Sequence, residues 1–385
     1  MAATDKPRRQ VTQHDIAARC GLSQKAVSLA LQGDARLTAE TIARVRAAAA
    51  EMGYHPANHQ AARRLVARRY GRRVTNHVIA LFMPRAFQRM VYFATIVQGV
   101  LDALATSQFA LVIVQYNGAD CEFPPIFDGG EVDGVICYGS SPSTLLHRLR
   151  ETPGGDSMPV VSLTAPLPGC SAVTTDSCRG AYLATRHLLE LGHRNILHFY
   201  NPDWGPEYVQ RFAGLTQALH EYGLNPADHA CLCHSYLGNI IPPHHLAIPS
   251  PTTDYLEAGF RAEYLQAFLA YLREHPEITA ILAQNDIQGR RIGYLLRKTG
   301  CRIPQEMSII GFDDTDPLLD EFGDNILTTV HLPLEEIGRT AAELLLRQIA
   351  AATPTPEQIT LPTALVVRGS TANPGATGDQ FTTSA

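Results

Sequence analysis

The chain has 385 residues, a formal net charge of -5, 45% apolar residues and 18% charged residues. This composition is typical of a globular protein, and the length predicts two or three domains. The apolar runs are shorter than the ~20 residues of a membrane-spanning helix, and the N-terminal segment has no apolar stretch of a secretory signal. Eight scattered cysteines do not form a disulfide framework. We therefore expect a cytoplasmic protein.

The charge is distributed unevenly along the chain. Residues 1–73 contain 14 Lys and Arg and 5 Asp and Glu, which gives +9. Residues 74–385 contain 18 Lys and Arg and 32 Asp and Glu, which gives -14. A basic segment attached to an acidic body predicts that the two parts bind different partners, with a polyanion as the partner of the basic segment.

Three short helices are predicted within residues 11–57. Apolar residues at helical spacing indicate the first helix, which Gly21 ends. Ser23 can cap the second helix, because its hydroxyl can accept from an unpaired amide of the first turn. Two helices joined by a turn that contains glycine are typical of a helix-turn-helix. A small helical bundle with a solvated basic face is the alternative.

In a helix-turn-helix the second helix lies in the major groove of DNA, with its N-terminal residues at the base edges. Gln24 and Lys25 occupy those positions, and Gln can pair with adenine whereas Lys can donate to guanine. Leu29, one turn later, offers only an apolar contact. Contacts to phosphate position a protein without reading the base sequence. The candidates for them are Thr12, Ser23, Ser28, Gln32 and Tyr54.

The segments 11–31 and 38–56 resemble the headpiece of the LacI (lactose-repressor-like) family. The shared elements are V-T-x-x-D-[IV]-A, the G-[VL]-S turn, a V-S pair, T-x-x-x-V and the closing [LM]-G-Y-x-P. The resemblance implies a homodimer whose headpieces bind a pseudo-palindromic operator in double-stranded DNA. The family's usual Thr-Val-Ser-Arg is Ala-Val-Ser-Leu at 26–29, and its Asn near the end of the helix is Gln32. The operator is therefore expected to differ from the common family half-site.

Residues 58–76 are predicted to form a hinge and a basic linker. The family's hinge segment A-R-x-L matches residues 62–65, which implies that Leu65 wedges into the minor groove. Such a wedge bends DNA towards the major groove. Several arginines could contact phosphate, although a solvated basic linker is the alternative. These arginines are Arg63, Arg64, Arg68, Arg69, Arg72 and Arg73.

In residues 77–370 predicted strands alternate with predicted helices. Apolar, β-rich runs such as HVIALF, which starts at His77, alternate with helices such as that at about 287–299. This alternation indicates parallel sheets, and about 290 residues are too many for one sheet. The predicted fold class is α/β, with a three-helix helix-turn-helix headpiece and a two-lobed, periplasmic-binding-protein-like body. Residues 1–10 and 371–385 are expected to be flexible tails.

The body also resembles that of the LacI family, nearly from end to end. The matching segments are Y-F-A-T-I-V-Q-G (92–99), V-D-G-V-I (132–136), residues 176–196, R-F-A-G-L (211–215), T-A-I-L-A-Q-N-D (279–286) and S-I-I-G-F-D-D (308–314). The resemblance implies that the body is similar to a periplasmic sugar-binding protein and that a small ligand, often a sugar or a nucleobase, binds between the lobes. It also implies that the chain crosses between the lobes near 176, 331 and 357.

A polyol is bound by planar groups that contact pairs of hydroxyls and by an aromatic face that covers the ring. Asp176, Arg211 and Asp286 match the family's ligand contacts, and Arg211 with Asp286 is the expected pair. The aromatic candidates are Trp204, Tyr92 and Phe93. The alternatives are structural, because an Arg–Asp pair is more often an internal salt bridge and aromatic residues at helical spacing are more often core.

Two family contacts are replaced and one loop is extended. The family's Asn before the aromatic pair is Met90, and its Gln after the T-T-[IV] strand is His331. Residues 231–256 form a longer loop than usual, which could line the ligand site or lie on the surface. The identity of the ligand therefore stays open.

No metal, cofactor or catalytic site is predicted. The spacing of Cys231, Cys233 and His234 with the pair His244 and His245 fits no common zinc arrangement. The sequence motifs of serine hydrolases, zinc peptidases, P-loops and dinucleotide sites are absent. The chain is therefore expected not to be an enzyme.

The expected function is that of a DNA-binding transcriptional regulator that is switched by a small ligand such as a sugar. We expect a repressor, since repression is the family's commoner mode. A sugar-binding module of the transport type is one alternative, but it predicts a signal peptide and no basic headpiece. A regulator of the LacI type without a small-molecule effector is the other.

Replacing Leu65 by alanine tests the predicted hinge. We expect affinity for operator DNA to fall more than affinity for non-specific DNA, because only the bent operator accommodates an inserted side chain. Arg68→Ala is the control, and it should only reduce the salt dependence of binding. Fluorescence anisotropy with both DNAs measures these affinities. If Leu65→Ala changes neither affinity, the hinge assignment is wrong.

Overall fold

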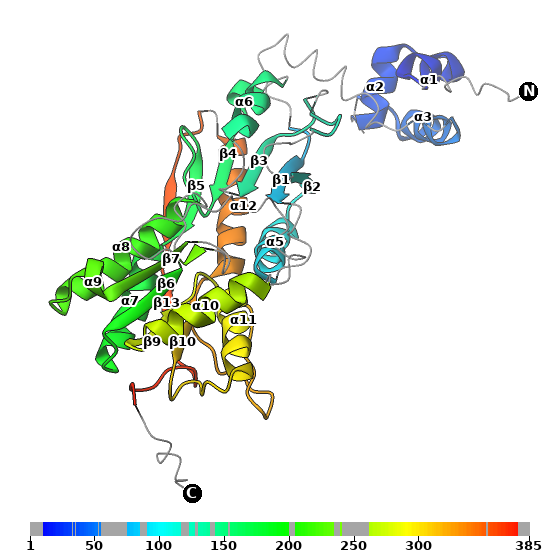
Figure 1. The fold of residues 1–385 in the computed structure, drawn as a ribbon. Helices are drawn as coiled ribbons and strands as arrows, with labels where there is room; N and C mark the ends of the chain where they lie inside the picture. Colours follow the sequence, from blue (N-terminus) through cyan, green and yellow to red (C-terminus); the bar gives the residue numbers. More distant parts are fainter. Residues whose placement is uncertain are drawn as a thin grey trace, which may run out of the picture. The chain divides into compact units, whose positions relative to one another are not determined.

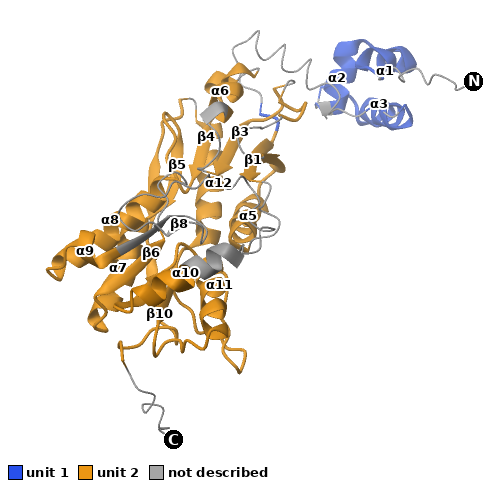
Figure 2. Ribbon diagram, viewed as in Figure 1, with its two compact units in different colours: residues 1–76 blue, residues 77–385 orange. Residues whose placement is uncertain are grey.

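The computed structural model describes residues 11–32, 34, 36–52, 54, 75–84, 91–116, 123–127, 130–138, 143–152, 155–199, 205–234, 239–240, 262–351 and 353–375. The chain forms two compact units, residues 1–76 and residues 77–385 (Figure 2). We call them the headpiece and the body and describe each by itself.

Within the described residues the headpiece contains three helices, which confirms the predicted helical fold of this unit. They are α1 (Gln13–Cys20), α2 (Gln24–Gln32) and α3 (Ala39–Glu51). Thr12 and Asp15 form a capping box, in which the Asp15 carboxylate accepts from the Thr12 backbone N–H at 2.8 Å. Gly21 ends α1 at φ 65°, a left-handed conformation that glycine adopts at low cost. This turn lets α2 pack across α1.

A small apolar core joins the three helices. Ile16 of α1, Val27 of α2 and Val45 of α3 are fully buried against one another, with alanines between them. Because alanine side chains are short, the helices can approach closely. The remaining face of α2 is left to solvent.

The body contains two sheets, each in its own lobe (Figure 1). In lobe 1 the strand order is β12-β5-β4-β3-β1-β2, and every pair is parallel. These strands are β1 (Val78–Pro84), β2 (Ala110–Tyr116), β3 (Gly134–Tyr138), β4 (Val160–Leu163), β5 (Ser171–Thr175) and β12 (Gln358–Leu361).

In lobe 2 the strand order is β13-β11-β10-β9-β6-β7-β8. The pairs β11–β13 and β7–β8 are antiparallel and the others are parallel. These strands are β6 (Asn195–Phe199), β7 (Ala230–His234), β8 (Asn239–Ile240), β9 (Ile278–Leu282), β10 (Ser308–Asp313), β11 (Thr328–His331) and β13 (Ala364–Val366). The predicted two-lobed α/β fold is thus confirmed.

Helices link the strands of both lobes (Figure 1). Those of lobe 1 are α5 (Val91–Leu104), α6 (Ser143–Glu151), the 3-10 turn η3 (Gly155–Ser157) and α12 (Leu334–Ala350). Those of lobe 2 are α7 (Ser177–Glu190), α8 (Pro206–Glu221), α9 (Pro226–His229), α10 (Ala262–Glu274) and α11 (Asp286–Lys298). The central helices pack in pairs, α12 with α5 and α7 with α8.

The chain crosses between the lobes three times. It leaves lobe 1 after β5 and enters α7, and it returns after β11 to enter α12. The third crossing lies between β12 and β13. Since Leu361 still pairs with β5 of lobe 1, this crossing comes after 361 and not near the predicted 357.

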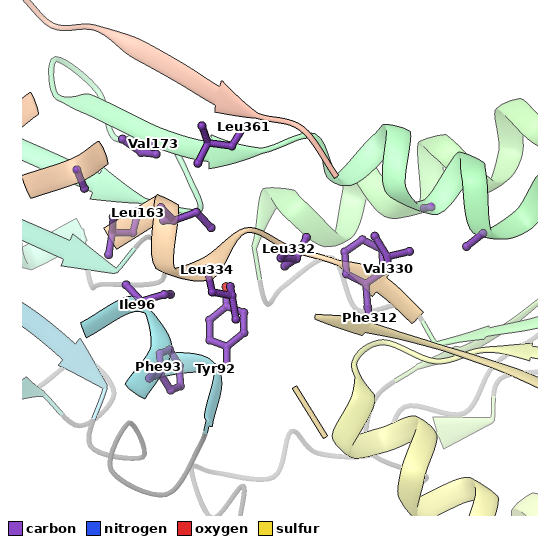
Figure 3. Packing of buried hydrophobic residues seen from close by; sticks show 14 of the residues in the cluster. Tyr92, Phe93, Ile96, Leu163, Val173, Phe312, Val330, Leu332, Leu334 and Leu361 are labelled. Carbon is purple, nitrogen blue, oxygen red and sulfur yellow. The ribbon is translucent and has the colours of Figure 1, made fainter. Parts of the chain in front are cut away.

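One apolar cluster extends through both lobes (Figure 3). It contains Leu163 and Val173 of lobe 1, Phe312 and Val330 of lobe 2, and Leu332 on the second crossing. Apolar side chains buried on a crossing hold that segment against both sheets, because exposing their apolar surface to water would cost about 25 cal/mol per Å². The crossings are therefore anchored in the core.

Helices α5 and α12 pack closely because a glycine on each helix lies against the backbone of the other helix. A Cβ atom added at Gly99 would overlap the carbonyl oxygen of Glu335, and one added at Gly338 would overlap that of Ile96. Neither overlap involves a side chain that could move aside. Any larger residue must therefore push the helices apart.

Gly338→Ala should lower the free energy of unfolding by about 1–3 kcal/mol, the usual cost of overpacking. Gly289→Ala on α11 is the matched control, because its new Cβ would lie 3.5 Å from the Ala283 Cβ, an ordinary contact. This control should be neutral or more stable, by up to ~1 kcal/mol. Urea unfolding measures both, and equal effects would contradict the close packing of α5 on α12.

Candidate functional site

The outer face of α2 presents the residues predicted to contact bases. Gln24 and Lys25 are exposed at the start of the helix, and Ser28 and Leu29 are partly exposed one turn later. Val27, between them, is fully buried in the headpiece core. The burial pattern therefore turns one edge of α2 inwards and leaves the four predicted positions outside.

The predicted phosphate contacts differ in their surroundings. The Ser23 hydroxyl accepts from the backbone N–H of Ala26 at 3.2 Å, which caps α2 as expected. The Thr12 hydroxyl donates to Asp15 at 2.7 Å. Tyr54 is only 6% exposed and packs in the headpiece core. The side chains of Gln32, Arg63 and Leu65 lie outside the described residues.

In the body, the candidate ligand site lies where strands of both lobes end. Ligands of parallel α/β sheets bind beside the carboxyl ends of the strands. In lobe 2, β10 ends at Asp313 and β9 leads to Gln284, and in lobe 1, β3 ends at Tyr138. Arg211 on α8 joins the first two of these residues.

Arg211 is the central side chain of the site and is only 7% exposed. Its Nη1 donates to the carbonyl oxygen of Gln284, and its Nη2 lies 3.8 Å from Oδ1 of Asp313. Its Cζ lies 3.7 Å from the ring centroid of Phe312 and 5.1 Å from that of Tyr208. These contacts hold a planar group with five donors in one orientation.

Arg211 and Asp286, the two residues expected to contact the ligand, do not pair with each other. Arg211 pairs with Asp313, whereas Asp286 accepts from the Thr329 hydroxyl at 2.5 Å and from the backbone N–H of Thr315 at 2.7 Å. Asp286 is the first residue of α11, which packs on β10, so its carboxylate faces the interior of lobe 2. Burial raises the pKa of Asp286 to about 7, an effect that hydrogen bonds from Thr329, Thr315 and Asp316 only partly offset.

Six polar side chains from the two lobes meet in a group that we call the interlobe cluster. They are Tyr92, Tyr138, Glu207, Tyr208, Arg211 and Asp313. The rings of Tyr92 and Tyr138 in lobe 1 are T-shaped, with centroids 6.2 Å apart. Burial raises the pKa of Tyr92, and the nearby Asp313 of lobe 2 raises it further. Burial also raises the pKa of Tyr138, with smaller contributions from Tyr92 and from Glu207 of lobe 2.

The other predicted ligand contacts lie at the edge of this cluster or outside it. Phe93 is buried, and its ring packs edge-on against Tyr138 with centroids 5.0 Å apart. Asp176 lies at the first crossing, where its carboxylate caps α7 by accepting from the backbone N–H of Arg179 at 2.8 Å. Trp204 and Met90 lie outside the described residues. The prediction of a loop at 231–256 is wrong at its start, because residues 231–234 belong to β7 and residues 239–240 form β8; the rest of this segment lies outside the described residues.

The sequence prediction misses four members of the cluster, although each leaves a signal. Asp313 and Tyr138 directly end apolar strands, the position where parallel sheets place ligand contacts. Glu207 precedes Arg211 by four residues, which places both on one face of α8. Tyr208 adjoins Glu207 and leaves only its aromatic character as a signal.

The backbone that carries Asp313 is strained. Asp313 has φ 110° and Asp314 has φ 62°, in the region that L-residues rarely adopt. Asp314 accepts from Arg368 at 2.7 Å and contacts His331 at 3.1 Å. Such strain persists only where surrounding contacts enforce it, and it is concentrated at functional sites. These contacts therefore help to aim Asp313 at Arg211.

Comparison with protein families agrees with both units. The family model described as "Bacterial regulatory proteins, lacI family" matches residues 12–57. "Periplasmic binding proteins and sugar binding domain of LacI family" matches residues 76–236, and "Periplasmic binding protein-like domain" matches residues 185–371. These matches confirm the resemblance and the fold class predicted from the sequence.

Individual proteins resemble the chain over most of its length. The HTH-type transcriptional regulator AglR of Rhizobium meliloti (strain 1021) is 30% identical over 370 residues, 94% of each chain. A LacI family transcriptional regulator from Enterococcus faecium, solved with bound ribose, is 26% identical, with a TM-score of 0.61 over 77% of this chain and 99% of that one. The lac repressor dimer bound to operator and the anti-inducer ONPF shares the fold, with a TM-score of 0.64 at 19% identity over 94% and 100% of the two chains.

These relatives are transcriptional regulators, which confirms the prediction that the chain is not an enzyme. Within the part of the chain that the structure describes, no helix combines the length and the apolar character needed to cross a membrane.

Asp286→Asn tests the environment of the buried carboxyl. The folded protein retains the Asp286 proton up to about pH 7, whereas the usual pKa is 3.8. Protonation of Asp286 therefore stabilises the folded state fully below pH 3.8, and this stabilisation is lost as the pH rises from 3.8 through about 7. Asparagine mimics the protonated form. The free energy of unfolding of the variant minus that of the parent should therefore be about 1–4 kcal/mol larger at pH 8 than at pH 4.

Urea unfolding of both proteins across this pH range measures the difference. Parallel stability profiles of the variant and the parent would contradict a raised pKa for Asp286.

Proposed function

The chain belongs to the LacI family of bacterial transcriptional regulators, and we propose that it represses transcription as a homodimer on a pseudo-palindromic operator. A small ligand, a sugar, would bind at the interlobe cluster and change the affinity for operator DNA. The observation that carries this proposal is the buried guanidinium of Arg211, held among polar side chains of both lobes.

The headpiece supports the DNA-binding part of the proposal. The exposed edge of α2 offers Gln24 and Lys25 to base edges and Leu29 to an apolar contact, as the major groove requires. Lys25 is the donor best suited to guanine on this edge. Ser28 adds a hydroxyl for phosphate. Of the predicted hinge residues, Arg63 would contact phosphate and Leu65 would insert into the minor groove.

The polar chemistry of the interlobe cluster supports the ligand-binding part. A planar guanidinium and carboxylates can bind pairs of hydroxyls, and tyrosine rings can cover the apolar face of a sugar. We place Arg211, Asp313, Tyr92 and Glu207 in direct contact with the ligand. Of the earlier candidates, Phe93 and Asp286 would position these side chains without contacting the ligand, Phe93 by packing on Tyr138 and Asp286 through its charge on Asp313. Asp176 would cap α7 at the first crossing.

Thermodynamic linkage would connect the two parts. The lobes contribute opposite sides of the cluster, so a ligand that contacts both must favour one arrangement of the lobes over another. A change in lobe arrangement would alter the spacing of the two hinges in a dimer. The Leu65 side chains could then no longer insert together, and affinity for the operator would change.

Two other functions are less well supported. A transport-type sugar-binding module would not need the headpiece, whose residues 12–57 match the regulatory family. A regulator without a small effector would not need a buried Arg211 with an unpaired Nε, which within the described residues finds no hydrogen-bond partner. Each of these functions predicts a different response to ligand.

Arg211→Ala should abolish the response of operator binding to ligand and leave ligand-free operator affinity unchanged. Truncating one partner of a buried charge pair costs about 2–5 kcal/mol, so the ligand concentration needed for half response should rise about 30-fold or more. Arg302→Ala is the matched control, because its side chain is 61% exposed and pairs only with Glu306 in the same loop. Operator binding by anisotropy, with increasing ligand, measures both.

A parallel loss of operator affinity and ligand response in Arg211→Ala would instead assign Arg211 a structural role. Full ligand response in the same variant would show that the ligand binds elsewhere.

A further inference from the structure

Glu207 forms no ion pair or hydrogen bond with another side chain among the described residues, although the charge of Arg211 acts on it. It lies in the first turn of α8, one turn before Arg211. A Cβ atom at Gly205 would lie 2.5 Å from Glu207 Oε2, so glycine at this position leaves room for the carboxylate to fold back over the start of the helix. Gly205 itself has φ 151°, a conformation that favours glycine. The local backbone is therefore shaped around this carboxylate.

The carboxylate of Glu207 has an unused acceptor. Its Oε2 atom is buried, and among the described residues it has no hydrogen-bond partner. A buried polar atom without a partner costs about 1–3 kcal/mol, and more if the group is charged. Burial accordingly raises the pKa of Glu207. A ligand that supplies a donor at this atom would recover that free energy on binding.

The charges around Glu207 are unbalanced. Arg211 pairs with Asp313 and donates to the Gln284 carbonyl, so the positive charge that acts on Glu207 is shared with Asp313. Asp286 is a further buried carboxyl close enough to Asp313 to raise its pKa. Among the described residues whose charges act on Glu207, Arg211 is the only cation. The site thus contains more acid than base.

Aromatic rings complete the surroundings of this carboxylate. The charge of Glu207 contributes to the raised pKa values of Tyr92, Tyr138 and Tyr208, and Tyr208 is its neighbour on α8. Burial and these charges raise the pKa of Tyr208 to about 12. The three phenols therefore stay neutral, and their ring faces carry negative potential. A carboxylate beside several aromatic rings is a combination that attracts an ammonium group.

We propose that the effector carries a protonated amine that pairs with Glu207, as in an amino sugar. This inference rests on the proposed function of the interlobe cluster as the ligand site. An ammonium group brings one positive charge and three donors, so it would balance the excess carboxylate and satisfy Oε2. The hydroxyls of the same ligand would contact Arg211 and Asp313. A neutral sugar would leave the charge on Glu207 unbalanced.

Thermal unfolding of the full-length protein with matched sugar pairs tests the proposal. The probes are D-glucosamine with D-glucose and D-galactosamine with D-galactose, at a pH at which the amines are protonated. A ligand that binds only the folded state raises Tm. At least one amino sugar should bind about tenfold or more tightly than its neutral counterpart, the scale expected for a hydrogen bond to a charged group.

Glu207→Gln should remove this preference, so that each amino sugar binds no more tightly than its neutral counterpart. Its own Tm without ligand should equal or exceed that of the parent, because a buried acid has been neutralised. Glu221→Gln is the matched control at the other end of the same helix. The carboxylate of Glu221 lies outside the cluster and accepts a 2.7 Å hydrogen bond from the Tyr182 hydroxyl. This control should keep the preference for the amine.

Equal shifts by amino and neutral sugars, or a preference that survives Glu207→Gln, would overturn the amine inference while leaving the sugar-binding proposal intact. If no sugar of either kind shifts Tm, both the sugar-binding proposal and the inference built on it are contradicted.

Discussion

The candidate ligand site depends on one buried charge, the guanidinium of Arg211. A buried arginine is tolerated only where carboxylates and carbonyls satisfy its donors. Here Gln284 and Asp313 contact its two Nη groups from the ends of β9 and β10, the ring of Phe312 covers the guanidinium face, and among the described residues only Nε is left without a partner. The strained turn at Asp313 persists because it serves this pair. The contacts of Arg211 therefore fix the positions of Gln284 and Asp313 at the end of lobe 2 that contributes to the interlobe cluster.

The same charge explains why the lobes form one functional unit. Tyr92 and Tyr138 come from lobe 1, yet their hydroxyls sense the charges of Asp313 and Glu207 in lobe 2. The apolar cluster that runs through Phe312 and the second crossing lies against this polar group. Polar side chains at the meeting point of two lobes make the arrangement of the lobes sensitive to whatever binds there.

Much of this arrangement follows from the sequence, but the charge pairing does not. Hydrophobic periodicity predicts the alternating strands and helices, and motifs identify Arg211, because both are local properties of the chain. The partner of Arg211 is Asp313 and not Asp286, since α11 packs on β10 and turns the Asp286 carboxylate towards Thr329. Such a choice depends on contacts between distant segments. The same reason hides Glu207, whose charge acts on Tyr92 and Tyr138 in distant segments of the chain.

The central claim is that ligand and operator bind to one linked system, and linkage requires each to alter the affinity for the other by the same factor. The most direct test is calorimetric titration of the ligand into full-length protein, free and bound to operator DNA. The account predicts different ligand affinities in the two titrations, with a ratio equal to the change in operator affinity that saturating ligand produces. Equal ligand affinities with and without operator would contradict it.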